Sequence, residues 1–180
     1  MKNLLYPVLF IVLNTFIGYS QIISINDESF PESKQSLEEL ITNVLISRNC
    51  SDVYNFEPKV FGEPEDFETK SYGYFKRPQG SDFPFEEGVI LTTGRAFPAG
   101  NAIIDIDDIL DNYNGNQIIN DDDGDGDLEE ALAQTMTQDA TFIKFNFTSQ
   151  VESISFRFLM ASEEYDGYFE CYFADSFAFL

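Results

Sequence analysis

Carboxylates supply most of the chemistry that this sequence could perform. Between Asp121 and Asp127 an aspartate stands at every second position, and Gly126 falls at the sixth position. Oxygen ligands with this spacing, followed by a glycine at a sharp turn, form the first half of an EF-hand-type calcium loop. The twelfth position is Leu132 instead of a bidentate Glu, so Glu129 or Glu130 would coordinate only in a loop of different shape. The sequence therefore predicts a Ca2+ site made by these acidic residues: Asp121, Asp123, Asp125, Asp127 and Glu130.

Two other interpretations of this acidic stretch stay open. Residues 105–130 hold eleven acidic residues and no Lys or Arg, so the stretch could be a solvated loop without a metal. Asp127 also fits the start of a short helix that places Leu128, Ala131 and Leu132 on one face. Helix capping by Asp127 is compatible with metal binding.

A second group of carboxylates follows the strongest strand patterns. Glu163 and Glu164 are adjacent there. A glycosidase places two carboxylates about 5–9 Å apart across a sugar-binding cleft. Neighbouring residues on a strand point to opposite faces, so this pair cannot act together in that way. We expect structural hydrogen bonding or shared cation binding, and the alternative is a carbohydrate-binding or carbohydrate-active jelly-roll domain that uses Glu163 or Glu164.

The composition excludes several classes of function. The chain of 180 residues has 10 Lys or Arg against 32 Asp or Glu, a formal net charge of -22, and no His. The absence of His removes Ser-His-Asp and Cys-His catalysis together with histidine zinc sites. The negative charge repels nucleic-acid phosphates and anionic lipids. The enzyme chemistries that remain are mainly carboxylate-based, and nucleic-acid binding is not expected. For the domain as a whole we expect no enzyme activity.

Residues 1–20 have the pattern of a cleavable signal peptide. Lys2 precedes an apolar stretch, and the small residues Gly18 and Ser20 fit the site of signal peptidase. An uncleaved membrane anchor is the alternative, but polar residues interrupt the apolar run, which is shorter than the roughly 20 residues of a spanning helix. We expect the mature domain, residues 21–180, outside the cell and without a membrane span.

Two cysteines, Cys50 and Cys171, lie in this exported part. An even number of cysteines in an oxidising compartment favours one disulfide. The bridge would close a loop of about 120 residues and stabilise the fold by roughly 4–5 kcal/mol. Two buried thiols are the alternative.

Periodicity predicts the elements that must position these groups. A helix is expected over residues 36–45, with a capping box at its start, and a buried strand over residues 88–94. Apolar residues alternate with polar ones over residues 142–147 and 153–160, and the last alternation is still running at Leu180. This predicts a mainly β fold, an antiparallel β-sandwich or jelly roll with one or two short helices, that continues past the last residue. Four rings are expected to face its core: Phe145, Phe147, Phe156 and Phe158.

Several of these segments resemble the choice-of-anchor L domain family. Residues 88–94 resemble its G-[IV]-[IL]-L-[ST]-[ST]-G run, and residues 124–128 resemble its G-D-x-D-L motif. Residues 156–165 resemble its F-x-F-x-x-A-S-E-E-Y signature, and residues 171–179 the N-D-x-F-x-F that follows, with Ala174 in place of the usual Asn. The most specific matches are Ser162, Glu163, Glu164, Tyr165 and Asp175.

The resemblance implies an extracellular β domain without assigned catalysis, attached to or released from the cell surface. The Phe-rich tail and the acidic composition suit type IX secretion of the Bacteroidetes kind, with an anchoring or sorting domain beyond residue 180. We interpret the chain as a calcium-stabilised module for adhesion or surface display, whose extracellular ligand the sequence does not identify. A structural spacer is a further alternative.

Overall fold

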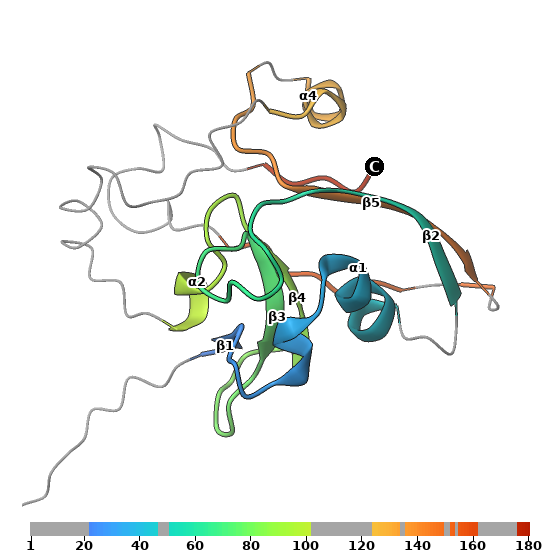
Figure 1. Cartoon of the computed structure of the whole chain (residues 1–180). Coiled ribbons are helices and arrows are strands. Elements are labelled where there is room, and N and C mark those ends of the chain that lie inside the picture. Colours follow the sequence, from blue (N-terminus) through green and yellow to red (C-terminus); the bar gives the residue numbers. More distant parts are fainter. Residues whose placement is uncertain are drawn as a thin grey trace, which may run out of the picture.

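The computed structural model describes residues 22–46, 51–101, 124–133, 136–149, 152–153, 155–161 and 176–180. Its strands form two antiparallel sheets (Figure 1). The first sheet has the order β1 (Ser24–Ile25), β3 (Tyr72–Lys76), β4 (Glu87–Leu91), and the second pairs β2 (Ser51–Lys59) with β5 (Phe142–Ser149). With a few short helices, this confirms the predicted mainly β fold of antiparallel strands.

The expected helix over residues 36–45 is confirmed as α1 (Leu37–Leu40), which continues into the π-helical turn η2 (Ile41–Leu45). Ser36 and Glu39 form the predicted capping box. The Ser36 hydroxyl accepts a hydrogen bond from the Glu39 backbone N–H at 3.3 Å, and the Glu39 carboxylate accepts one from the Ser36 N–H at 2.9 Å. The box satisfies two backbone donors at the helix start.

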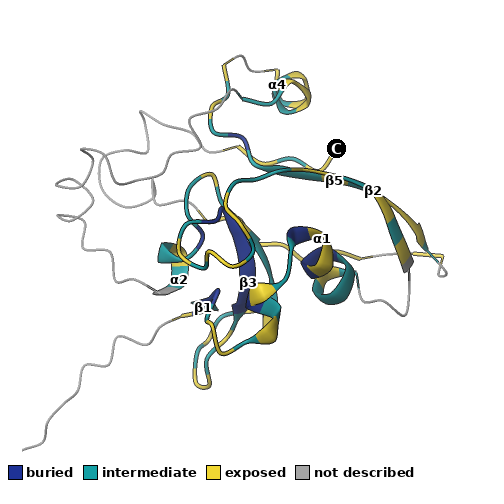
Figure 2. Cartoon of the chain, in the orientation of Figure 1, coloured by how far each residue is buried: buried dark blue, intermediate teal, exposed yellow. Residues whose placement is uncertain are grey.

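The main core lies between this helix and β3. It consists of five buried apolar side chains: Leu37, Leu40, Ile41, Tyr72 and Tyr74. Figure 2 shows the buried residues concentrated on β3 and on the inner side of α1. The 3-10 turn η1 (Pro31–Lys34) leads into α1, and the Phe30 ring before it meets Tyr74 edge to face at 5.9 Å. A separate, smaller cluster of buried residues gathers around Ile25 and Phe75. Because Phe75 neighbours Tyr74 on the strand, its side chain lies on the opposite face of β3.

The predicted strand over residues 88–94 is β4, but it ends at Leu91 and is only half-buried. In the described part of the chain β4 is paired along one edge, with β3. The chain turns after Leu91. The Thr92 hydroxyl donates to the carbonyl of Gly94 at 2.7 Å and lies 3.1 Å from that of Ser71.

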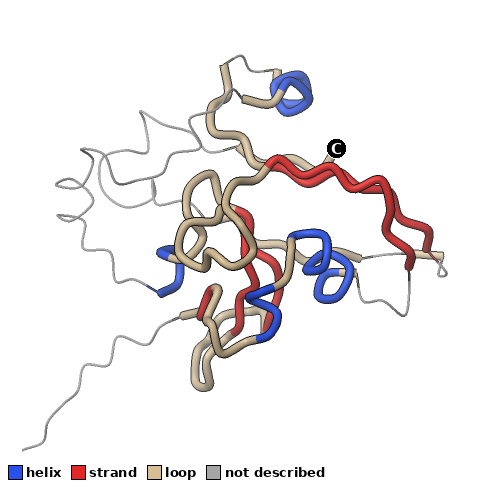
Figure 3. Tube along the Cα trace, viewed as in Figure 1, coloured by secondary structure: helices blue, strands red, loops and turns tan. Residues whose placement is uncertain are grey.

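The second sheet is a two-stranded ribbon. β2 and β5 pair from Ser51–Ser149 to Lys59–Phe142, with an irregularity between Tyr54 and Glu57. One face of the ribbon packs on the main core through stacked rings of Phe56 and Phe145, whose centroids lie 6.4 Å apart. Figure 3 shows the ribbon extending past the first sheet.

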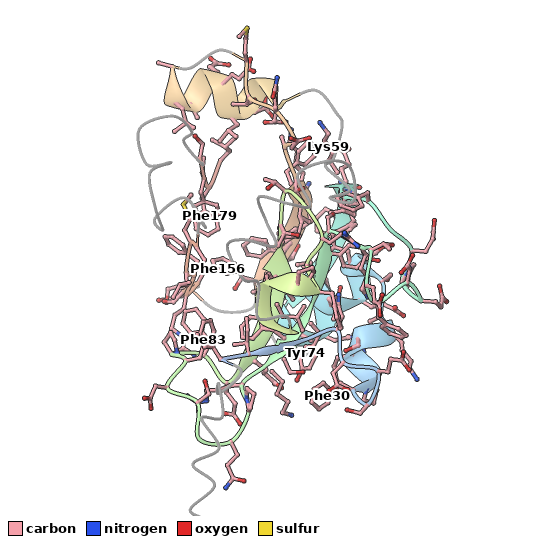
Figure 4. The ribbon with its side chains drawn as sticks, turned by 90° about the vertical axis from the view of Figure 1, so that its left-hand side faces the viewer. Phe30, Lys59, Tyr74, Phe83, Phe156 and Phe179 are labelled. Carbon is pink, nitrogen blue, oxygen red and sulfur yellow. The ribbon has the colours of Figure 1, made fainter. Side chains whose placement is uncertain are left out.

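The expected orientation of the last aromatic residues is partly wrong. Phe145 packs against the core, but Phe147 is 37% exposed, and Phe156 and Phe158 are 42% and 59% exposed. The described residues of the predicted strand over 153–160 form no strand. Alternation fixes which side chains share a face, whereas burial also needs a second surface to cover that face. Figure 4 shows Phe156 and Phe179 in one column at the side of the molecule.

The predicted leader, residues 1–20, lies outside the described residues. Within the described ranges, no helix combines the length and apolar character that crossing a bilayer requires.

Candidate functional site

The described half of the predicted calcium loop builds the start of α4 (Gly126–Leu132). The Asp125 carboxylate caps this helix by accepting a hydrogen bond from the Leu128 N–H at 2.9 Å. The expectation that Asp127 begins the helix is therefore wrong by two residues. Asp125 has the extended backbone, φ -124° and ψ 121°, that an N-cap requires, whereas Asp127 already lies in the first helical turn.

Thr137 closes the loop in front of this helix. Its hydroxyl accepts a hydrogen bond from the Asp125 N–H at 3.0 Å, and its own N–H donates to the Glu129 carboxylate at 2.8 Å. Gly124 lies so close that a Cβ there would stand 2.0 Å from the Thr137 hydroxyl oxygen. The glycine of the G-D-x-D-L segment is thus required by this contact. Sequence reasoning missed Thr137 and the role of Glu129.

Two lysines of the ribbon hold the same segment. Lys59 donates to the Gly124 carbonyl at 3.3 Å, and Lys144 pairs with the Asp127 carboxylate. The hydrogen bond to Asp127 raises the pKa of Lys144, and the negative charge of Asp127 acts in the same direction. Asp127 therefore already has a cation beside it.

The structure brings together only part of the predicted calcium ligands. Asp121 and Asp123 lie outside the described residues, Asp125 caps α4, Asp127 pairs with Lys144, and Glu130 is exposed. Among the residues that the structure describes, no three His, Cys, Asp or Glu side chains gather closely enough to hold a metal. The remaining predicted positions also lie outside the described residues: Cys50, Ser162, Glu163, Glu164, Tyr165, Cys171 and Asp175.

A hollow of about 400 Å3 opens beside β1. Three stretches far apart in the sequence line it: β1 with the turn after it, the loop between β2 and β3, and the residue before α2 (Pro98–Asn101). They contribute three carboxylates, from Asp27, Glu28 and Glu68, and two aromatic rings, from Phe67 and Phe97. No motif or spacing in the sequence indicated this site, because only the fold brings the stretches together.

Asn26 clamps the base of the hollow. It is 1% exposed, and its side-chain amide donates to the carbonyls of Tyr72 at 3.1 Å and Phe67 at 3.4 Å. Its side-chain oxygen accepts from the Tyr74 N–H at 3.2 Å. A Cβ on Gly73 would lie 2.1 Å from that oxygen, so the side chain fits only against a glycine. The Asn26 side chain therefore links the turn after β1 to β3 and to the loop between β2 and β3 that contains Phe67.

The buried Lys70 holds the loop that carries Phe67 and Glu68. Its ammonium donates to the carbonyls of Ser33 at 2.7 Å and Pro64 at 3.1 Å, and lies 5.0 Å from the Tyr72 ring centroid. Burial lowers the pKa of Lys70 to about 8, against the opposing charges of Glu65 and Asp66. The Lys70 carbonyl accepts from the Ala96 N–H at 3.0 Å, which places Phe97 beside this loop.

Asp27 is a lining carboxylate whose pKa is shifted by the hydrogen bonds around it. Hydrogen bonds from the side chain and backbone of Ser29, and from the Ser24 hydroxyl, lower the pKa of Asp27. The Ser29 N–H donates at 2.8 Å. Asp27 is therefore an anion at neutral pH, which suits ion binding and does not suit proton donation.

The comparison with known families agrees with the sequence motifs. A family model described as "Choice-of-anchor L domain" matches residues 25–180. The chain belongs to the choice-of-anchor L domain family. Membership of this family indicates an exported or cell-surface protein. The match runs from Ile25, the last residue of β1, to Leu180. A search of curated proteins and a search of solved structures returned no match.

Proposed function

We propose that this chain is a non-catalytic module, displayed outside the cell, that serves adhesion or surface display through the hollow beside β1. The observation that carries the proposal is the hollow itself, which holds carboxylates and aromatic rings above a base that buried hydrogen bonds of Asn26 hold together. A pre-formed concave site with a few oriented polar groups is typical of ligand binding. Family membership supports the location outside the cell.

The chemistry of the hollow favours binding over catalysis. Carboxylate enzymes need one acid whose pKa is raised so that it can donate a proton near neutral pH. The shift of Asp27 is in the opposite direction, because its oxygens already accept hydrogen bonds. The hollow is thus suited to present fixed negative charge.

Display outside the cell is tested on intact cells that produce the full chain with its own leader. We expect added protease and an antibody to the chain to reach it without permeabilisation, and we expect residues 1–20 to be absent from the exported product. Deletion of the leader is the control that should retain the chain inside. A chain that stays protected from protease in intact cells would refute display.

We also propose that a calcium ion and a disulfide brace the module. Asp121, Asp123, Asp125, Asp127 and Glu130 would supply oxygen ligands, and Cys50 would pair with Cys171. The clustered carboxylates of this segment repel one another unless cations neutralise them. Among the described carboxylates, that of Asp127 pairs with the Lys144 ammonium. Thermal melting with and without chelator tests the metal: we expect a lower midpoint with chelator, and an unchanged midpoint removes calcium. Mass spectrometry of the unreduced protein tests the disulfide.

A carbohydrate-binding module is the second candidate. The observation that favours it is the pair of Phe rings beside carboxylates, since sugars stack on aromatic faces and donate hydroxyl hydrogen bonds to carboxylates. The sequence offers Glu163 or Glu164, which lie outside the described residues, as the sugar-binding carboxylate of this candidate. Glu163→Ala and Glu164→Ala variants should then lose polysaccharide retention on affinity gels, with Glu38→Ala as the control. Equal retention of all variants would eliminate this candidate.

A further inference from the structure

We propose that the hollow beside β1 binds a positively charged side chain, an arginine or a lysine, on a partner protein. This inference rests on the proposed function, because it names the chemical class of ligand that the displayed module would hold. It concerns Asp27, Glu28 and Glu68, with the rings of Phe67 and Phe97.

Charge is the first argument. Three of the lining side chains are acidic, and none of the described residues that line the hollow is a Lys or Arg. The chain as a whole has a formal net charge of -22, which reinforces the local negative potential. A concave surface with charge of one sign concentrates ligands of the opposite sign. The ligand is therefore a cation.

Spacing decides between a metal ion and an organic cation. Ca2+ needs six to eight oxygens at about 2.3–2.6 Å, so its carboxylate ligands must converge on one point. All three acids lie in the described part of the chain, where no such convergence of three acidic groups occurs. Carboxylates that are spread around a hollow instead suit a group with several separated N–H donors. A guanidinium has five donors in a planar fork, and an ammonium has three.

The aromatic walls suit the stem and the face of such a group. An alkyl stem buries apolar surface against a ring, while the charged head interacts with the ring face or with carboxylates. The Phe67 ring already has the Lys70 ammonium at 5.7 Å from its centroid.

The hollow does not need to form on binding. Asn26 ties the Phe67 backbone to β3, and Lys70 ties the same loop to η1. Walls that are held in place before binding reduce the entropy cost of capturing a flexible side chain.

The test uses the purified full chain and two small probes of nearly equal shape. N-acetyl-arginine amide carries a guanidinium, and N-acetyl-citrulline amide replaces it with a neutral urea group. Titration followed by NMR should show saturable shifts at Asp27, Glu28 and Phe97 with the arginine probe, and affinity about tenfold weaker with citrulline, since hydrogen bonds between charged partners are the stronger ones. Raising the salt concentration should weaken arginine binding.

Charge-matched variants locate the site. Glu28→Gln combined with Glu68→Gln should weaken binding of the arginine probe about tenfold or more. Glu38→Gln combined with Glu152→Gln removes the same charge outside the hollow and should leave binding nearly unchanged. Both double variants change exposed side chains, and thermal melting verifies that they fold.

Equal binding of the two probes, an equal effect of the two double variants, or shifts only at residues outside the hollow would each overturn the inference. Binding of Ca2+ or of a neutral sugar at these residues, without arginine binding, would do the same. A chain that is displayed on intact cells yet binds no arginine probe refutes this inference alone. A chain that binds the probe but stays inside the cell refutes the proposed function alone.

Discussion

The body around β3 and the ribbon of β2 and β5 both carry acidic segments, but they hold them by different means. In the body, buried polar groups fix the backbone: Asn26 bridges three segments, and Lys70 donates to two carbonyls at 0% exposure. On the ribbon, the half-buried Lys59 and the exposed Lys144 hold the stretch from Gly124 to Asp127. Buried hydrogen bonds thus fix the acidic segments of the body, whereas lysine side chains near solvent fix the acidic segment beside the ribbon.

This difference has energetic consequences. Buried polar groups that lose a partner cost their full desolvation energy, whereas exposed ion pairs contribute little and weaken with salt. The walls of the hollow should therefore stay fixed over a wide range of conditions. The loop before α4 should respond to ionic strength and to added cations. Substitutions at Asn26, at Lys70 and at the start of α4 test this contrast.

The largest effect is expected at Asn26. Asn26→Ala removes three hydrogen bonds from a residue that is 1% exposed and leaves buried backbone groups on Tyr72 and Tyr74 without that partner. We expect a loss of about 3 kcal/mol in the free energy of unfolding, measured by urea denaturation. Asn26 has φ 51°, so Asn26→Gly, which is free of strain there, separates backbone strain from lost hydrogen bonds.

Asn43 provides the matched control. Its side-chain amide donates to Gln35 at 3.1 Å in a half-buried setting on η2. Asn43→Ala should cost less than about 1 kcal/mol. Similar losses for both asparagines would contradict the distinction between the clamp and an ordinary side-chain hydrogen bond.

The next effect concerns Lys70 and pH. The ammonium has its usual pKa of 10.5 when unfolded and a pKa of about 8 when folded. Below pH 8 both states are charged, and burial destabilises the fold. Above pH 8 the folded state releases its proton first, so stability rises with pH, by roughly 2 kcal/mol between pH 7 and pH 10.

Lys70→Met should remove this rise, and denaturation across the pH range compares the two proteins. Measurements should stop near pH 10. Burial raises the pKa of Tyr72 from 10.0 to about 12 in the folded state. Above pH 10 the tyrosine therefore ionises in the unfolded state first, and this lowers the stability of the fold. A wild-type stability that is flat, or that falls, between pH 8 and pH 10 would show that Lys70 is not desolvated.

The buried side chains of Asn26 and Lys70 could not be predicted from the sequence. The capping box at Ser36 and the strand alternation at Phe142–Phe147 depend on residues close in sequence, and both were predicted. Asn26 and Lys70 depend on partners 46 and 37 positions away. A lone Asn or Lys in a loop has no periodicity, so nothing local indicates that it will be buried.

The aromatic alternation after residue 153 shows the complementary limit. The pattern of Phe156 and Phe158 is that of a half-buried strand, yet both rings are exposed. Phe158 instead contacts Phe177 and Phe179, with centroids 5.2 Å and 5.1 Å away. Periodicity predicted that these rings share a face, but it could not predict the surface against which the face packs.

The smallest effect separates capping from charge on the ribbon side. Asp125→Ala removes the cap of α4 and should cost about 1 kcal/mol locally, seen as faster amide exchange across Gly126–Leu132. Asp127→Ala removes only the exposed pair with Lys144, so its effect should be smaller and should vanish in high salt. Asp125→Asn keeps a capping oxygen without the charge and should behave nearly as the wild type in the absence of calcium.

If calcium binds as proposed, both alanine variants should also lose the response of the melting midpoint to chelator. A chelator response that survives in both would place the ion away from Asp125 and Asp127, and α4 would then be held by its cap and by Lys144 alone.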